Sequence, residues 1–202
     1  MLSSEKQFTN FKIHTQYSIC EGAIKIDDLA SHCKLNKIKA IGICDSLNLC
    51  GALEFAEKIS KSGTHPLIGT QINFTFDKII SKLPLFATSQ KGYKNLTKLS
   101  SKSYLDIDDL SDPHCQFKDL YKLNEDLIIL SGGLNDFFGE LFKANKIKII
   151  NEIFTEISKI FGNRFYIEIQ RHNEIDESSF EEFLLKASSK FNLPIIATQE
   201  VY

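Results

Sequence analysis

Two similar stretches organise this sequence: Phe11-Lys12-Ile13-His14-Thr15-Gln16-Tyr17-Ser18 and Ala40-Ile41-Gly42-Ile43-Cys44-Asp45-Ser46-Leu47-Asn48-Leu49. Each begins with a short apolar run, which is typical of a buried β-strand, and each run stops at a polar residue that can bind a metal ion or a substrate. We therefore expect any chemistry to lie where these two strands end.

Apolar runs of strand length alternate with segments of helical periodicity through the rest of the chain. In residues 25–37, for example, Ile26, Leu29 and Cys33 recur at helical spacing. The next helix is expected to have Asn48 as its N-terminal cap and to end at Ser62-Gly63. The predicted strands are 11–13, 40–44, 66–69, 85–87, 127–130, 165–169 and 194–197, and the remaining predicted helices are 93–103, 137–142, 147–161 and 180–191.

About seven strands interleaved with helices predict an α/β architecture with a parallel sheet, and either a barrel or an open doubly wound sheet would fit. A parallel barrel carries its functional groups at the carboxyl ends of the strands, whereas an open sheet gathers them at one crevice. Polar residues follow nearly every predicted strand, so we favour the barrel. These residues are His14, Asp45, Gln71, Ser131, His172 and Glu200.

The composition is that of one compact soluble domain: 202 residues, of which 43% are hydrophobic and 25% charged, with four prolines. We expect a cytoplasmic protein, because the first residues lack the apolar region of a signal peptide and no run approaches the length of a membrane span. The five cysteines are scattered and show no zinc-finger spacing, which argues against a disulfide framework or a cysteine metal site.

Five residues form a candidate metal site when no family is considered: His14, Glu21, Asp45, His172 and Glu200. Imidazole and carboxylate groups suit hard or borderline divalent ions, and metal-assisted hydrolysis of a phosphate ester is the reaction that such a site supports. Taken singly, each residue is better explained as an ordinary hydrogen-bonding group. Phosphate loops of the GxxxxGK[ST] and GxGxxG types are absent from the sequence.

A row of lysines is the one local feature that could contact nucleic acid. Lys91, Lys94, Lys98 and Lys102 recur at helical spacing, which is also the pattern of an ordinary solvated helix face. The formal net charge is −2, so the chain as a whole offers no electrostatic attraction to phosphates. We expect at most weak DNA binding through these four lysines.

Nearly the whole chain resembles the PHP (polymerase and histidinol phosphatase) domain at the N-terminus of bacterial DNA polymerase III alpha subunits. The residues that carry the resemblance begin with 11–18 and Glu21-Gly22-Ala23. They continue with Cys44-Asp45-Ser46-Leu47-Asn48-Leu49-Cys50-Gly51, Pro66-Leu67-Ile68-Gly69, Gly92-Tyr93-Lys94-Asn95-Leu96, Ile167-Glu168-Ile169-Gln170-Arg171-His172 and Ala197-Thr198-Gln199-Glu200-Val201-Tyr202. The resemblance implies a distorted seven-stranded (β/α) barrel of the TIM type, formed by residues 1–202 as the N-terminal part of a much longer chain. The last elements of the domain would then lie beyond Tyr202.

The resemblance also implies a metal site of about nine ligands at the strand ends, from which this sequence departs. Neutral residues, namely Gln16, Ser46, Gln71, Gly133 and Tyr202, stand where the family has ligands. We therefore predict no catalytic residue and no metal, with a vestigial rim formed by His14, Gln16, Glu21, Asp45, Ser46, Gln71, His172 and Glu200.

The function expected from the resemblance is that of a scaffold within a DNA-directed DNA polymerase. The polymerase reaction and its Mg²⁺ are expected in other domains of the longer chain. The expected partners are the polymerase core and a proofreading exonuclease subunit, with DNA bound only through the assembled enzyme. The alternative is a metal-dependent PHP phosphoesterase, acting on pyrophosphate or on a 3′ nucleotide end, with Zn or Mn held by His14, Glu21, His172 and Glu200.

Overall fold

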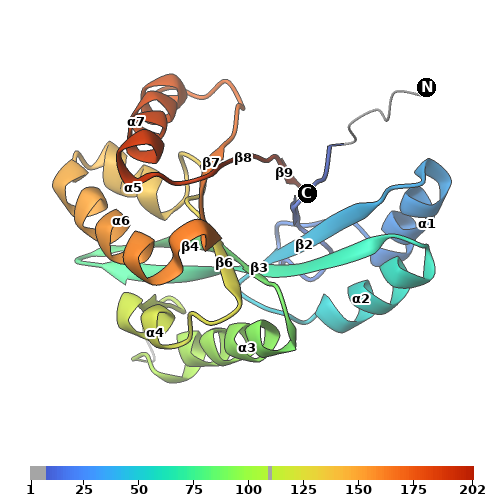
Figure 1. Cartoon of the computed structure of the whole chain (residues 1–202). Coiled ribbons are helices and arrows are strands. Elements are labelled where there is room, and N and C mark those ends of the chain that lie inside the picture. The colour runs from blue at the N-terminus through green and yellow to red at the C-terminus, as the bar shows by residue number, and fades with distance from the viewer. Residues whose placement is uncertain (1–7, 109–110) are drawn as a thin grey trace.

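A computed structural model describes residues 8–108 and 111–202, which form a curled sheet with helices packed around it (Figure 1). The sheet has nine strands in the order β8-β7-β6-β4-β3-β2-β1-β9, and β5 pairs with β3 outside this path. The strands are β1 (Lys12–Ile13), β2 (Ala40–Ser46), β3 (His65–Phe76), β4 (Ile79–Ala87), β5 (Cys115–Gln116), β6 (Leu127–Leu130), β7 (Phe165–Ile169), β8 (Ile195–Ala197) and β9 (Glu200–Val201).

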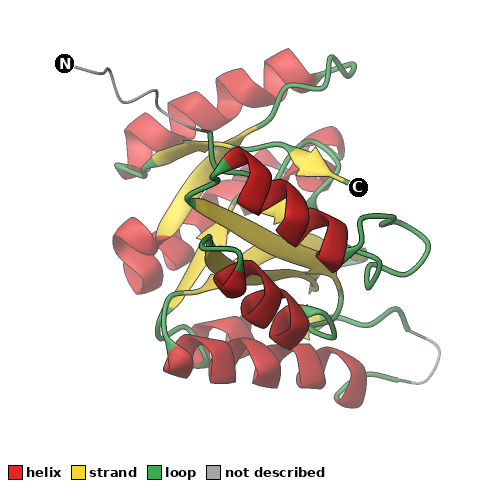
Figure 2. Cartoon of the chain, turned by 90° about the vertical axis from the view of Figure 1, so that its right-hand side faces the viewer, coloured by secondary structure: helices red, strands yellow, loops and turns green. Residues whose placement is uncertain are grey.

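Helices follow most of the strands and cover the outside of the sheet (Figure 2). Each helix buries one apolar stripe; in α1, for example, Ile26, Leu29 and Cys33 are buried. The helices are α1 (Ile26–Asn36), α2 (Ala52–Lys61), α3 (Gln90–Leu105), α4 (Phe117–Lys122), α5 (Phe137–Lys143), α6 (Ile147–Phe161) and α7 (Glu177–Phe191), with a 3₁₀ turn at Gly162–Arg164.

The two ends of the sheet come from neighbouring parts of the chain. β8 pairs with β7 and β9 pairs with β1, while only Thr198 and Gln199 separate β8 from β9. The sheet therefore curls into a half-barrel, which confirms the α/β fold and the barrel-like architecture expected from the sequence. The nine strands exceed the seven expected, because β5 and β9 are two-residue strands without an apolar run of their own.

The expectation of an all-parallel sheet was wrong at β4. This strand runs antiparallel to both β3 and β6. The sequence predicted separate short strands at 66–69 and 85–87, whereas β3 and β4 form one long hairpin in which Ile72 pairs with Leu83. The turn between them includes Asp77, whose φ of 55° is a conformation that Asp tolerates.

Asn48 does not cap the helix that follows it. The N-cap of α2 is Gly51, and Asn48 instead holds the preceding loop together. Its Nδ2 donates to the carbonyl oxygens of Tyr17 and Ser46, and its Oδ1 accepts from the backbone N–H of Cys50. An Asn ahead of a helix serves as a loop clamp here because its amide can both donate and accept.

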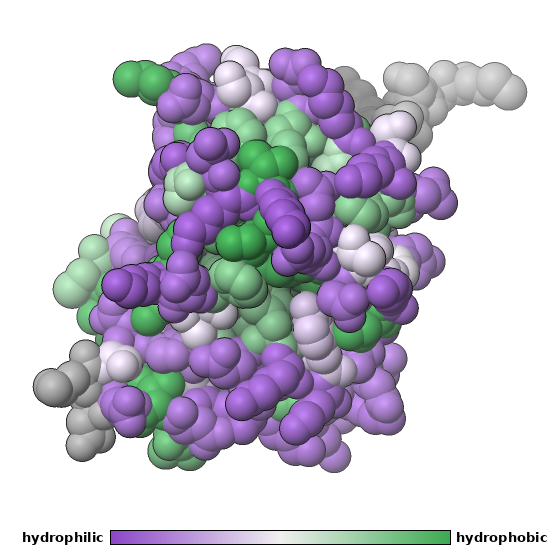
Figure 3. All heavy atoms as spheres, turned by 90° about the vertical axis from the view of Figure 1, so that its left-hand side faces the viewer, coloured by the Kyte–Doolittle hydropathy of each residue, from purple (hydrophilic) through white to green (hydrophobic). Residues whose placement is uncertain are grey.

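The apolar core has two main parts. The larger lies among the β3–β4 hairpin, β6, β7 and helices α3 to α7, and the smaller joins α1 and α2 to β1 and β2. On the face shown in Figure 3, apolar side chains gather in the middle and hydrophilic ones surround them. No helix within residues 8–108 and 111–202 is long and apolar enough to cross a membrane.

Candidate functional site

A buried lysine lies inside the curled sheet, where three carboxylates converge on it. The Lys12 Nζ atom is 3.2 Å from Asp136 Oδ2, 3.3 Å from Glu168 Oε1 and 3.1 Å from Glu200 Oε1. Lys12 and Glu168 are fully buried, and the Glu200 side chain is 18% exposed. We call Lys12, Asp136, Glu168 and Glu200 the Lys12 cluster.

Strand register explains how Lys12 reaches this position. Successive side chains of a strand point to opposite faces, so Lys12 and His14 share one face of β1 while Ile13 packs into the smaller core. Lys12 also pairs in register with Glu200 of the neighbouring parallel strand β9. The alternation of β1 therefore brings a cation and an imidazole to the concave side of the sheet.

Electrostatic attraction outweighs burial at two members of the cluster, Lys12 and Glu200. Burial by itself would lower the pKa of Lys12, but the three carboxylates outweigh it and raise that pKa well above its ordinary value. Burial would likewise raise the pKa of Glu200, yet a hydrogen bond with His14 and the Lys12 ammonium lower it to about 2. For Asp136, burial prevails over the attraction of Lys12 and raises the pKa.

His14 contacts side chains rather than facing an open site. Its Nε2 lies 3.3 Å from Glu200 Oε1, and its Nδ1 lies 3.3 Å from Ser18 Oγ. The imidazole is fully buried and stacks on the Tyr202 ring, with 4.4 Å between the ring centroids. Both ring nitrogens therefore already have partners within the chain.

Asp45 is held by the loop that follows β1. Its Oδ1 accepts hydrogen bonds from the Thr15 backbone N–H at 2.6 Å and from Ser18 Oγ at 2.7 Å. Its Oδ2 accepts from Thr15 Oγ1 at 2.8 Å. These three donors occupy both oxygens of a buried carboxylate, so Asp45 anchors the loop between β1 and α1.

Two neutral residues of the predicted rim, Ser46 and Gln71, form hydrogen bonds with carboxylates of the rim. Ser46 Oγ donates to Glu21 Oε2 at 2.5 Å, and Gln71 Nε2 donates to Glu200 Oε1. Glu21 also pairs with Lys82, at 2.8 Å. Partial burial would raise the pKa of Glu21, but the hydrogen bonds from Lys82 and Ser46 lower it. Hydroxyl, amide and ammonium groups thus bind Glu21 and Glu200, two carboxylates that were candidate metal ligands.

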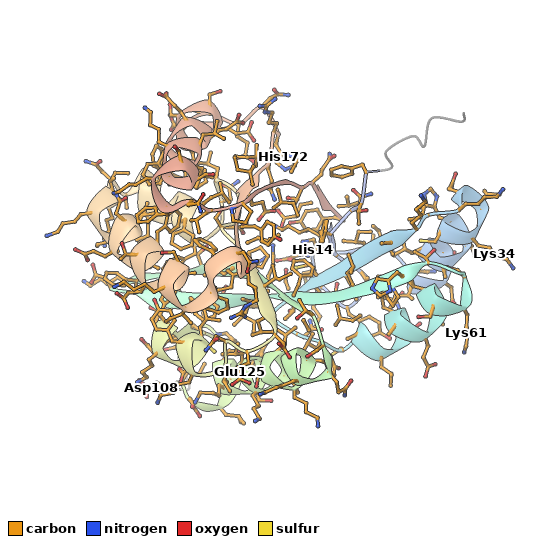
Figure 4. The ribbon with its side chains drawn as sticks, viewed as in Figure 1. His14, Lys34, Lys61, Asp108, Glu125 and His172 are labelled. Atoms are coloured by element: carbon orange, nitrogen blue, oxygen red, sulfur yellow. The ribbon has the colours of Figure 1, made fainter. Side chains whose placement is uncertain are left out.

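Two residues of the predicted rim lie outside this inner network. Gln16 is exposed in the loop after β1, and the structure does not bring it to the Lys12 cluster. His172 is exposed in the segment that leaves β7, whereas His14 lies closer to the centre of the ribbon (Figure 4). His172 does line an open cleft of about 550 Å³ together with Gln71, Lys82, Asp136 and Glu200.

The donor set does not fit a metal centre of several ions. In the part of the chain that the structure describes, no three His, Cys, Asp or Glu side chains are grouped so that they could hold a metal ion. An ammonium lies among the three carboxylates, and the Glu21 side chain is engaged with Lys82. One oxygen, Glu168 Oε2, is buried without a hydrogen-bond partner among the described residues.

Comparison with known proteins identifies the family. The family model named PHP domain matches residues 10–172. The chain is a PHP domain. Its relatives include the DNA polymerase III subunit alpha of Caulobacter vibrioides, with 33% identity over 96% of this chain, and that of Borreliella burgdorferi, with 32% identity over 98%. The PHP domain spans only about 18% of the length of these relatives.

Solved structures share the fold of this PHP domain at low sequence identity. A proposed metal-dependent phosphoesterase from Bifidobacterium adolescentis gives a TM-score of 0.56 and 11% identity, covering 96% of this chain and 88% of the other. An amidohydrolase from Chromobacterium violaceum gives a TM-score of 0.61 and 9% identity, covering 96% and 87%. At such identities these likenesses establish the architecture alone.

The lysine row on α3 of the PHP domain is partly neutralised. Lys91 pairs with Glu125, and Lys102 pairs with Asp106 and lies 3.5 Å from Asp119. Lys94 and Lys98 are exposed on the same helix. The row therefore offers fewer free charges to phosphates than the sequence pattern alone indicates.

Sequence reasoning missed three members of the Lys12 cluster: Lys12, Asp136 and Glu168. Sequence signals could have revealed two of them. Lys12 alternates with His14 on a buried strand, and Glu168 is a lone carboxylate within the apolar run of β7. Asp136 gave no comparable signal, because it reaches the cluster from the loop before α5, where it also accepts a hydrogen bond from the Gly133 backbone N–H at 2.8 Å.

Proposed function

We propose that this PHP domain is a metal-free, non-catalytic scaffold within a replicative DNA polymerase alpha subunit. The Lys12 ammonium carries the proposal, because it supplies at the centre of the site the positive charge that carboxylate clusters otherwise obtain from bound cations. Asp45, Ser46 and Gln71 support it, since each of them already has hydrogen-bond partners within the chain.

The positive role in this proposal is protein contact. The relatives are DNA polymerase III alpha subunits, so the domain would pack on the polymerase core of the same chain and provide a docking surface for a proofreading exonuclease subunit. Polymerase chemistry and its Mg²⁺ would belong to other domains of the longer chain. The protein would be cytoplasmic. Contact of Lys91, Lys94, Lys98 and Lys102 with DNA would be weak at most.

A second candidate is a PHP phosphoesterase with a reduced metal site. It is favoured by the open cleft beside Glu200, into which His172 also faces, and by the description of one structural neighbour as a metal-dependent phosphoesterase. His14, Glu21, His172 and Glu200 would hold Zn or Mn in this case. His14 and Glu21 would first have to leave their present partners, Glu200 and Lys82.

Elemental analysis and an enzyme assay separate the two candidates. Protein purified without chelators should contain Zn and Mn well below one equivalent per chain, and it should not hydrolyse p-nitrophenyl phosphate or pyrophosphate above the level of His14→Ala. One stoichiometric metal, together with hydrolysis that His14→Ala abolishes in a folded protein, would establish the phosphoesterase instead.

The docking role needs its own test. The cognate exonuclease should co-purify with the isolated domain and with the full-length alpha subunit under the same conditions. Co-purification with the full-length subunit alone would place the contact on another domain, and the docking role would then be rejected.

A further inference from the structure

An open groove of about 450 Å³ lies between α3 and α4, on the side of the molecule away from the Lys12 cluster. The two helices are neighbours (Figure 1), and the ion pair between Lys102 and Asp119 joins them. The lining includes Lys98 from α3 and Lys122 from α4, both of which are exposed. We call this space the α3–α4 groove.

The positive charges of the α3–α4 groove exceed its negative charges. Three lysines line it, Lys98, Lys102 and Lys122, against one carboxylate, Asp119. Lys102 is engaged, because it lies 3.5 Å from Asp119 and also pairs with Asp106. Lys98 and Lys122 form no ion pair with any residue in 8–108 or 111–202. The excess positive charge of the groove therefore comes from these two ammonium groups.

The spacing of the lysines along each helix adds to this excess. Lys94 precedes Lys98 by four residues on α3, and Lys118 precedes Lys122 by four residues on α4. Like charges four residues apart in a helix repel each other and slightly destabilise it, whereas an opposite charge at this spacing stabilises it. On α7, by comparison, Lys186 has Glu182 at that spacing, 2.6 Å away. An anionic group bound in the α3–α4 groove would relieve the repulsion.

The surface between the lysines is apolar. Leu123 is half-buried, lines the groove and packs against the larger core. The Thr97 hydroxyl donates to the Tyr93 carbonyl oxygen of its own helix at 2.9 Å, so its methyl group is the part left for contacts. Lysine side chains contribute apolar stems below their charged ends. The groove thus combines an apolar floor with unpaired cations from both helices.

We propose that the α3–α4 groove is a docking site for a segment of a partner protein that carries a glutamate or an aspartate flanked by apolar side chains. The carboxylate would pair with Lys98 and Lys122, and an apolar neighbour would cover Leu123. Charge complementarity selects the acidic residue, and the apolar floor selects the residues beside it.

A peptide carboxylate suits the groove better than the backbone of a nucleic acid. Duplex DNA carries a continuous array of charges, about one for every 1.7 Å of its axis. Such an array would also meet the carboxylates near the lysines, namely Asp106, Asp119 and Glu125, which pair with Lys102 and Lys91. A single acidic side chain can approach Lys98 and Lys122 without extending over these carboxylates.

This inference rests on the proposed role in protein contact. It adds to that role the position of one contact surface and the chemistry of the segment that fits it. A second cavity, about 650 Å³, includes Leu53 in its lining but no lysine, and it serves as an internal reference for apolar binding without charge.

The test is a titration of the intact chain, labelled at leucine methyl groups, with three blocked tripeptides: Leu-Glu-Leu, Leu-Gln-Leu and Gly-Glu-Gly. Leu-Glu-Leu should shift the Leu123 methyl signals and leave those of Leu53 unchanged. Leu-Gln-Leu lacks the charge and Gly-Glu-Gly lacks the apolar groups, so each should bind more weakly. Binding of Leu-Glu-Leu should also weaken as salt is raised, because the lysines are exposed.

Lys98→Gln and Lys122→Gln remove one charge each at exposed helix positions, so the fold should be retained. Each should weaken binding of Leu-Glu-Leu by about threefold, the size expected for one exposed charge pair. Lys148→Gln is the matched control, because Lys148 is a 91% exposed lysine of another helix, α6, and its loss should not change binding.

Three results would overturn the docking site: equal shifts with Leu-Glu-Leu and Leu-Gln-Leu, no shift at Leu123, or tighter binding of a short DNA duplex that both lysine variants weaken. Co-purification with the exonuclease tests the proposed protein contact separately. A domain that co-purifies with the exonuclease but does not bind Leu-Glu-Leu would refute the α3–α4 groove alone, and the reverse result would refute the exonuclease contact alone.

Discussion

Lys12 is the residue on which the interior of this PHP domain depends. One ammonium lies within 3.1–3.3 Å of three carboxylates, and each of these comes from a different segment of the chain. Removing one partner of a buried ion pair strongly lowers stability, because the remaining charge stays buried without a partner. The Lys12 cluster therefore fixes how the ends of β1, β7 and β9 and the loop before α5 fit together.

Replacing this ammonium should destabilise the fold. Lys12→Met keeps most of the side-chain volume but leaves three carboxylates without their shared cation. We expect it to lower the free energy of unfolding by about 3–5 kcal/mol at neutral pH. Urea denaturation measures this loss, with Lys148→Met as the control, because the Lys148 side chain is 91% exposed and should change stability little. Equal stability of the two variants would show that the cluster is not a structural centre.

Glu200 should make stability fall in acid. Its pKa is about 2 in the folded chain, below the ordinary value of a glutamate, so its contribution is complete above pH about 4.3 and is lost as the pH falls towards 2. The shift corresponds to about 3 kcal/mol. Asp136 acts in the opposite direction, because its pKa is raised and its contribution is lost as the pH rises.

The measurement is a series of urea denaturations between pH 2 and pH 7. Glu200→Gln should flatten the acid side of the profile, and Glu152→Gln, at an exposed position, should leave its shape unchanged. A Glu200→Gln profile that runs parallel to that of the unaltered protein would mean that the carboxylate is not held by Lys12 and His14.

At the scale of the elements, the Gly92-Tyr93-Lys94-Asn95-Leu96 segment has a structural explanation. Gly92 lies in the first turn of α3, where an added Cβ would be 2.1 Å from the Asp126 carbonyl oxygen. Asn95 Nδ2 donates to the Glu125 carbonyl oxygen at 3.0 Å. Both residues attach the start of α3 to the loop before β6, so this stretch of the PHP resemblance serves to position these elements.

A methyl group at residue 92 should therefore push α3 away from this loop. We expect Gly92→Ala to cost about 1–3 kcal/mol of stability, the usual cost of overpacking, although alanine favours helices elsewhere. Thermal unfolding would measure the loss, and Lys94→Ala in the same helix should be nearly neutral because Lys94 is exposed. A Gly92→Ala protein that melts at the same temperature as Lys94→Ala would contradict the close packing.

The sequence was sufficient for elements whose signal is local. The sequence predicted α6, β2, β6 and β7 because the apolar residues that each element buries follow a helical period or a continuous run. The direction of β4 could not be found in this way, since it depends on pairing with β3 and β6. The sequence predicted a shared rim for His14, Asp45 and Glu200, but it could not show the contacts of Lys12, because these join residues more than a hundred positions apart.

At the scale of the whole molecule, the curled sheet encloses a network of charged side chains centred on Lys12. Solved structures with this architecture include a proposed metal-dependent phosphoesterase. In this chain, an ammonium, a hydroxyl group and an amide contact the carboxylates inside the curled sheet. The proposed metal-free role requires that these groups, rather than an ion, balance the carboxylates.

The most direct test of this account is an anomalous difference map from crystals of the chain soaked in Zn²⁺ or Mn²⁺. The account predicts no anomalous peak inside the curled sheet and continuous electron density for the Lys12 side chain, ending among Asp136, Glu168 and Glu200. A peak coordinated by three or more of the side chains of His14, Glu21, His172 and Glu200, with Lys12 displaced, would contradict it.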